Sequence, residues 1–172
     1  MKKILTLFII IAIIIILFLS MSKKEQMVAT VEGNIEKKYI KIIPNHFHDA
    51  ECAMTIVDEH YACEAISPSG KTWFFDDIGC LVNWLEDKDF KDEAVLWTHA
   101  EDTGNWIDAQ KAWYVRTDPT PMHYGFGARE HKKEGMIDFE EMRLMMLRGE
   151  TMADPRIRKK LLGMEISSYG SR

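Results

Sequence analysis

The sequence predicts an α+β protein made of two small, related strand-strand-helix-strand units preceded by an N-terminal transmembrane helix. Three observations lead to this fold class. The chain opens on an uncharged aliphatic run, the rest alternates short β-branched or aromatic stretches with helical patterns, and the two halves of that rest resemble each other. The chain has 172 residues, so the part after the opening run has the length of one typical domain.

The opening run, residues 4–19, consists mainly of Ile and Leu and is flanked by Lys2-Lys3 and Lys23-Lys24. It is longer than most signal-peptide cores and shorter than the ~20 residues that span a bilayer comfortably. We assign residues 1–22 to an N-terminal anchor or signal segment and favour an uncleaved anchor. The expected location is the inner cell membrane, with a single anchor and a periplasmic, extracytoplasmic soluble part.

A polar spacer, residues 23–48, follows the anchor and contains one expected strand or extended arm at residues 39–43. His46 and His48, at the end of the spacer, are interpreted as loop histidines. The formal net charge of the chain is -5, which argues against a nucleic-acid partner.

The first unit, residues 49–100, is predicted to contain strands at residues 50–57, 61–66, 71–75 and 94–98. Its helix should begin after Asp76-Asp77, because aspartate is a preferred N-cap. The apolar positions of that helix follow the i, i+3, i+4, i+7 spacing; they are Ile78, Leu81, Val82 and Leu85.

The second unit, residues 101–149, is predicted to contain strands at residues 106–115 and 122–128 and a helix that starts at Asp138. Residues 150–172 form a basic C-terminal helix or tail. In the repeat, His123-Tyr124 corresponds to His60-Tyr61, so Met122 and His123 would face the same cleft as His60.

Cys52 and Met54 are the first candidate metal ligands. In the predicted strand they would point to one face, and a thiolate with a thioether selects Cu(I) over harder ions. Core packing is the alternative interpretation of the same pair. The chain has three cysteines, Cys52, Cys63 and Cys80, so an oxidising compartment leaves at least one thiol unpaired.

Four ordered segments resemble the NosL family of membrane-associated copper-binding accessory proteins. They are Cys52-Ala53-Met54-Thr55-Ile56, Phe75-Asp76-Asp77-Ile78-Gly79-Cys80-Leu81, Gly104-Asn105-Trp106-Ile107-Asp108-Ala109 and Thr120-Pro121-Met122-His123-Tyr124-Gly125. The resemblance implies a fold of two small α+β units. It also implies a copper chaperone that holds Cu(I) and supports assembly of the copper centre of nitrous oxide reductase.

The resemblance also suggests the ligands. The family's C-x-M motif falls on Cys52 and Met54, and its Pro-Met segment ends on Met122. His60 lies one residue from a common family histidine, and His123 stands where glycine is common. This chain has no lipobox cysteine, and it has Ala53 where most relatives have glycine.

No Ser/His/Asp or Cys/His nucleophile arrangement and no Gly-rich phosphate loop stands out, so we do not predict an enzyme. Two alternatives stay open. One is a thiol-redox or organometal-cleaving enzyme that uses Cys52 with Cys63 or Cys80 and a carboxylate. The other is an interaction module that binds no metal.

Overall fold

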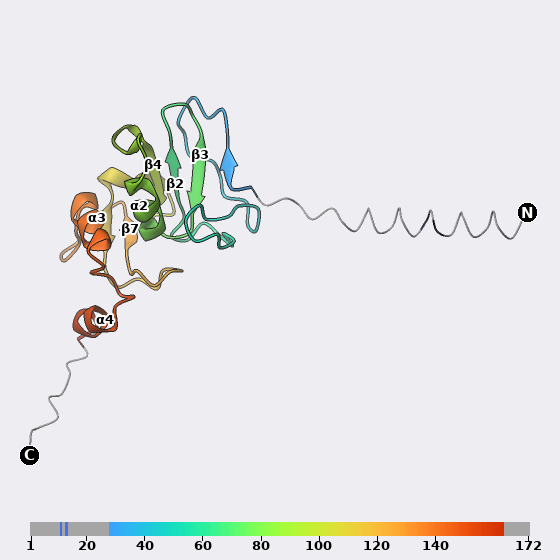
Figure 1. Cartoon of the computed structure of the whole chain (residues 1–172). Helices are drawn as coiled ribbons and strands as arrows, with labels where there is room; N and C mark the ends of the chain where they lie inside the picture. The colour runs from blue at the N-terminus through green and yellow to red at the C-terminus, as the bar shows by residue number, and fades with distance from the viewer. Residues whose placement is uncertain (1–10, 12, 14–27, 164–172) are drawn as a thin grey trace, which may run out of the picture.

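The computed structural model describes residues 11, 13 and 28–163, and it confirms the α+β class. A five-stranded antiparallel sheet has the strand order β1-β3-β2-β4-β5, and a second sheet pairs β6 with β7. The helices α2 and α3 lie together beside the larger sheet (Figure 1).

The central elements of the first unit lie close to where the sequence places them. They are β2 (Cys63–Ile66), β3 (Thr72–Phe75), α2 (Ile78–Glu86) and β4 (Val95–His99). The predicted cap of α2 is confirmed, because the Asp77 side chain accepts a hydrogen bond from the Gly79 amide at 2.9 Å. Strand β2 lies between β3 and β4, so it forms the middle of the sheet.

The prediction of a strand at residues 50–57 is wrong. This segment is a tight loop, and an isolated antiparallel bridge joins its Thr55 to His48 in the preceding chain. Ala53 has a φ of 60°, which a strand cannot accommodate. The expected strand at residues 39–43 is also absent, and the spacer instead contributes the short strand β1 (Thr30–Val31).

The strand predicted at residues 106–115 is broken in two. It forms β5 (Trp106–Asp108), a 3-10 turn (Ala109–Lys111) and β6 (Trp113–Val115). Asp108 accepts a hydrogen bond from the Gln110 amide at 3.0 Å, which favours the turn over a continuous strand. As a result, β5 joins the larger sheet, while β6 pairs with β7 (Gly127–Arg129).

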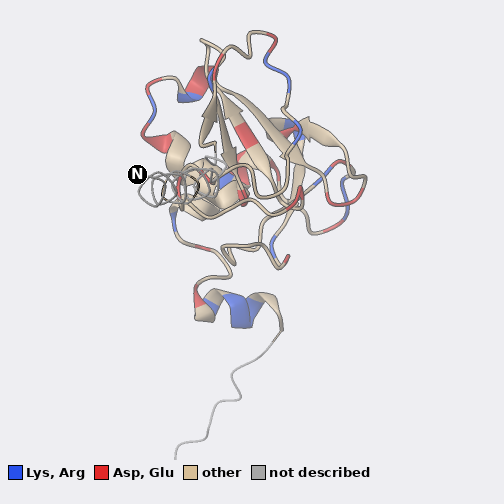
Figure 2. Cartoon of the chain, turned by 90° about the vertical axis from the view of Figure 1, so that its right-hand side faces the viewer, with Lys and Arg blue, Asp and Glu red and all other residues tan. Residues whose placement is uncertain are grey.

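Helix α3 (Phe139–Leu147) begins at the predicted cap, where Asp138 accepts a hydrogen bond from the Glu141 amide at 2.9 Å. Helix α4 (Pro155–Leu161) follows Asp154 and buries none of its residues. Its Lys and Arg residues colour part of the α4 ribbon blue, apart from the sheet, in Figure 2.

The two faces of the larger sheet are covered differently. Cys63 and Ala65 of β2 face the main core with α2 and α3, as does the fully buried Met142 of α3. Glu64, between them, is fully buried, and both its oxygens lie within 3.1 Å of the Ile40 amide. The irregular arm of the spacer therefore covers the other face of the sheet.

The predicted transmembrane helix at residues 4–19 lies outside the described residues, apart from Ile11 and Ile13. Within residues 28–163 and these two positions, no helix has the length and apolar character needed to cross a membrane.

Candidate metal centre

The loop that carries Cys52 is organised by Asp49. One oxygen of this buried carboxylate accepts hydrogen bonds from the amides of Glu51 and Cys52, at 2.7 and 2.9 Å. The other oxygen accepts from the amide of Asp76 at 3.0 Å. Backbone bonds between Asp49 and both Ala53 and Met54 close the loop. A single side chain therefore folds the loop and ties it to the end of β3.

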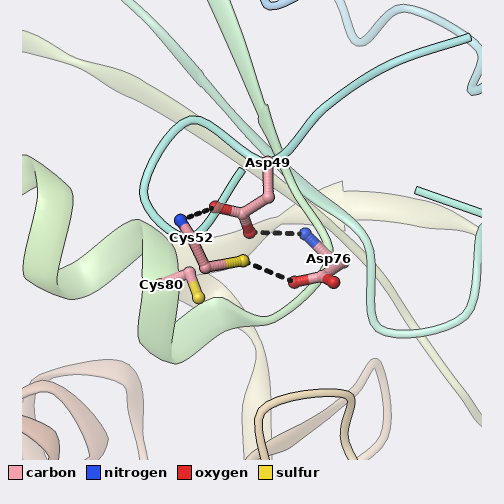
Figure 3. Close-up of side chains that lie close together, drawn as sticks. All are labelled: Asp49, Cys52, Asp76 and Cys80. Atoms are coloured by element: carbon pink, nitrogen blue, oxygen red, sulfur yellow. Dashed lines mark hydrogen bonds between the residues drawn. The ribbon is translucent and has the colours of Figure 1, made fainter. Parts of the chain in front are cut away.

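The second side of the site comes from the start of α2. Asp76 follows β3, Asp77 caps the helix, and Cys80 lies in the first helical turn with its side chain fully buried. Because the cap fixes the direction of this turn, Cys80 points to the loop that Asp49 holds in place (Figure 3).

Asp49, Cys52, Asp76 and Cys80 form one cluster, in which the ligand atoms all lie within 4.8 Å of one another. The Cys52 thiol donates to an oxygen of Asp76 at 4.0 Å. Two sulfurs bonded to one ion at about 2.3 Å lie no more than about 4.6 Å apart, so small movements suffice. The cluster can hold a metal ion.

The environment favours the protonated form of both thiols. Burial and then the charges of Asp49 and Asp76 raise the pKa of Cys52. Burial, and then the charges of Asp49 and Asp77, also raise the pKa of Cys80. Among the described residues, no Lys or Arg forms an ion pair with Asp49, Asp76 or Asp77. A bound cation would supply the positive charge that this acidic cluster lacks.

Burial, followed by contact with Asp49, likewise raises the pKa of Asp76. Cys52 is the half-buried member of the cluster, whereas Asp49, Asp76 and Cys80 are buried. The Cys52 side is therefore the open side of the site.

Met54 lies in the same loop as Cys52 and is 39% exposed. Its backbone amide acts to lower the pKa of Cys52, against the larger effect of burial. The two residues are not on a strand, so the reason given for placing their side chains on one face does not apply. Their closeness results from the loop that Asp49 closes.

The Met122 segment lies against the same helix start. Its amide donates to the second oxygen of Asp77 at 3.2 Å, and its side chain is partly buried beside the main core. Tyr124 packs against Gly79, and burial followed by the charge of Cys80 raises the pKa of Tyr124 to about 12. His123, between them, is exposed and has a φ of 59°.

His60 has a different partner. Its Nδ1 atom lies 2.7 Å from the Glu101 carboxylate, and its ring is mostly exposed. It does not belong to the Cys/Asp cluster, and the same holds for His123.

The sequence did not predict Asp49 or Asp76 as site residues, and it suggested Cys80 only for the alternative thiol enzyme. Cys80 flanks the apolar helical stripe, and Asp76 precedes a helix cap, so packing and capping explain both locally. The available signal was the placement of two aspartates directly before a helix with a cysteine in its first turn.

Comparisons of the chain with protein-family models, curated proteins and solved structures find no match. The fold and the site together define an α+β protein with a Cys/Asp cluster that can hold a metal ion.

Proposed function

We propose that this protein is a NosL-like, membrane-anchored, extracytoplasmic Cu(I) carrier that delivers copper to a client enzyme, nitrous oxide reductase. The N-terminal anchor and the two related units of the fold are part of this proposal. The observation that carries it is the convergence of the Cys52 and Cys80 sulfurs in one acidic, partly open cluster.

Two cysteine sulfurs form a suitable pair for a soft monovalent ion. Thiolates select Cu(I) over harder divalent ions, which carboxylates alone would prefer. The proposed site therefore uses Cys52 and Cys80 as its main ligands. Met54 and Met122 supply exchangeable thioethers from the adjoining loop and from the segment held by Asp77.

Acidic surroundings suit a carrier that must release its cargo. Both thiols have raised pKa values, so binding Cu(I) must displace their protons. Copper affinity should fall at acid pH. A client can then approach from the Cys52 side, where the cluster is open, and replace the ligands one at a time.

Backbone geometry supports the proposed family relationship. Ala53 and His123 occupy two positions where NosL proteins commonly have glycine, and both have a positive φ, 60° and 59°. Such a conformation favours glycine. Relatives with glycine at these two positions would adopt the same left-handed backbone most easily.

The test is a Cu(I) competition titration of the reduced protein against a calibrated chelator. Cys52→Ser and Cys80→Ser should each lower the affinity by at least about a hundredfold, whereas His46→Ala should leave it unchanged. Cys63→Ala is the matched control, because Cys63 is buried outside the cluster.

Two results of this titration would change the proposal. Wild-type affinity in Cys52→Ser would refute it. Wild-type affinity in Cys80→Ser alone would restrict the site to Cys52 with Met54 and Met122. X-ray absorption at the copper edge would count the sulfur ligands independently.

A second candidate, an organometal-cleaving enzyme, is favoured by one feature. Two thiols converge with the carboxyl group of Asp76. Burial and contact with Asp49 raise the pKa of Asp76, which favours its protonated form. The thiolates would take the metal of an organomercurial R–Hg–X and release X⁻. Asp76 would then give a proton to the carbon as the C–Hg bond breaks, yielding R–H and Hg²⁺ on both sulfurs.

Release of benzene from a phenylmercury salt would support this enzyme. Loss of that release in Asp76→Asn, with Cu(I) affinity retained, would separate the two candidate functions.

A further inference from the structure

A second group of potential ligands lies outside the cysteine cluster. The carboxylate of Glu101 contacts His60 Nδ1 at 2.7 Å through one oxygen and His99 Nδ1 at 2.9 Å through the other. We propose that His60, His99 and Glu101 form a separate site for a borderline divalent ion such as Zn²⁺ or Cu²⁺. Two imidazoles with one carboxylate form a donor set that suits these ions.

The sheet brings these residues together. His99 is the last residue of β4, and its amide donates to the Ala62 carbonyl at 2.9 Å, next to the start of β2. Because β2 and β4 pair antiparallel, the chain before β2 meets the chain after β4. His60 precedes one strand and Glu101 follows the other, so the backbone fixes their proximity.

The backbone near the site is held in an unfavourable conformation. Tyr61 has a φ of 61°, which is uncommon for a bulky residue. Its amide donates to Glu101 at 2.9 Å, to the oxygen that also contacts His99. Positive φ at a bulky residue is retained where the surroundings determine it, and such positions cluster at ligand sites.

Half of the site is buried, and the other half is exposed. The side chains of His99 and Glu101 are about nine-tenths buried, whereas that of His60 is 68% exposed. Burial raises the pKa of Glu101, but hydrogen bonds from His60, Tyr61 and His99 outweigh it and leave this pKa below its usual value. An ionised, buried carboxylate is thus ready to accept a cation.

The three ligand atoms are not as closely grouped as those of the cysteine cluster. The carboxylate lies between the two rings, whose centroids are 6.0 Å apart. An ion at this place must replace the His–Glu hydrogen bonds and turn the exposed His60 ring inward. Tetrahedral ligands at about 2.0–2.1 Å from the ion lie about 3.3 Å apart. The two His–Glu distances require little change to reach this value, whereas the two imidazole rings must approach each other.

The test uses full-length protein in detergent, with Cys52→Ser and Cys80→Ser both present so that the cysteine cluster cannot contribute. In this background, Zn²⁺ binding depends only on the His60, His99 and Glu101 site, so its outcome is independent of the proposed copper function. Calorimetric titration with Zn²⁺ should give one site per chain. Adding Glu101→Gln or His99→Asn should weaken binding at least about tenfold.

His60→Asn is the variant least able to disturb folding, because its side chain is exposed. It should also weaken Zn²⁺ binding at least about tenfold. His131→Asn is the matched control: it changes another exposed histidine, paired with Asp102, and should have no effect. With Cu²⁺, electron paramagnetic resonance should show two coupled nitrogens in the background protein and one in His60→Asn.

Two results would overturn the proposal. One is Zn²⁺ binding that His60→Asn and Glu101→Gln both leave unchanged. The other is the absence of Zn²⁺ binding by a folded background protein.

Discussion

The carboxylate of Asp77 connects the start of α2 to the Met122 segment. One oxygen accepts from Gly79 at 2.9 Å and caps the helix, and the other accepts from the Met122 amide at 3.2 Å. Asp77 is fully buried, and burial raises its pKa to about 6. The side chain that begins the helix carrying Cys80 therefore also positions the proposed thioether segment.

Asp77→Ala should lower the free energy of unfolding by about 2–4 kcal/mol, because it removes a cap and leaves a buried amide without an acceptor. Asp77→Asn is the informative comparison, since one amide oxygen can serve only one of the two amides well. We expect faster hydrogen exchange of the Met122 amide in both variants. Unchanged protection of this amide would show that Asp77 does not position the segment.

Ala53→Gly should stabilise the protein by about 0.5–1 kcal/mol. The gain comes from relieving the left-handed conformation of Ala53, partly offset by the greater freedom of glycine in the unfolded chain. Urea unfolding measures the change. Ala153→Gly, at an exposed position without a positive φ, should be neutral or destabilising. Equal effects at both positions would contradict the explanation.

Gly79→Ala should destabilise the protein by about 1–3 kcal/mol. A methyl group on Gly79 would meet the ring of Tyr124 and, at 2.9 Å, the sulfur of Met146. The displaced ring would also disturb the packing beside Cys80. Tyr124→Ala should reduce the additional cost of Gly79→Ala, and a double-mutant cycle by urea unfolding measures this coupling. Additive effects would mean that the ring is not the obstacle.

Glu64 should make the free energy of unfolding fall as the pH rises from about 4.5 to 8. Burial raises its pKa from 4.5 to about 8, so the folded protein binds a proton that the unfolded chain has lost across this interval. The stability due to this group is therefore complete below about pH 4.5 and is lost as the pH rises towards 8.

Glu64→Gln keeps an acceptor for the Ile40 amide but does not titrate, so its unfolding free energy should vary less between pH 5 and 8. Urea unfolding at several pH values measures the difference. Glu134→Gln, on the exposed surface, is the control and should keep the wild-type slope. A wild-type slope in Glu64→Gln would assign the pH dependence to other groups.

Local signals account for the parts of the fold that the sequence predicts correctly. Asp77, Asp138 and Asp154 each precede a helix and accept an amide of its first turn, a pattern contained within a few residues. Strands β3 and β4 likewise follow from short β-branched and aromatic runs. Such features need no knowledge of distant segments.

The site depends on contacts that local patterns do not contain. The segment around Cys52 has strand-like residues, but Asp49 folds it into a loop through the amides of Glu51 and Cys52. The same carboxylate ties the loop to the amide of Asp76, far along the chain. Cys80 meets Cys52 only because this loop packs on the start of α2. The hydrogen bonds of Asp49 override the β-propensity of the segment, and Cys80 was named only for the alternative enzyme and not as a copper ligand.

The closeness of Cys52 and Cys80 has a consequence for oxidation. Their sulfurs lie within 4.8 Å, and a disulfide requires about 2.05 Å. Removal of two electrons and two protons by an external oxidant would join them and eliminate both thiolate ligands in one step. Metal binding at the cluster would then depend on the redox state of the surroundings, and protein handled in air without a reductant would lose both thiols of the proposed Cu(I) site.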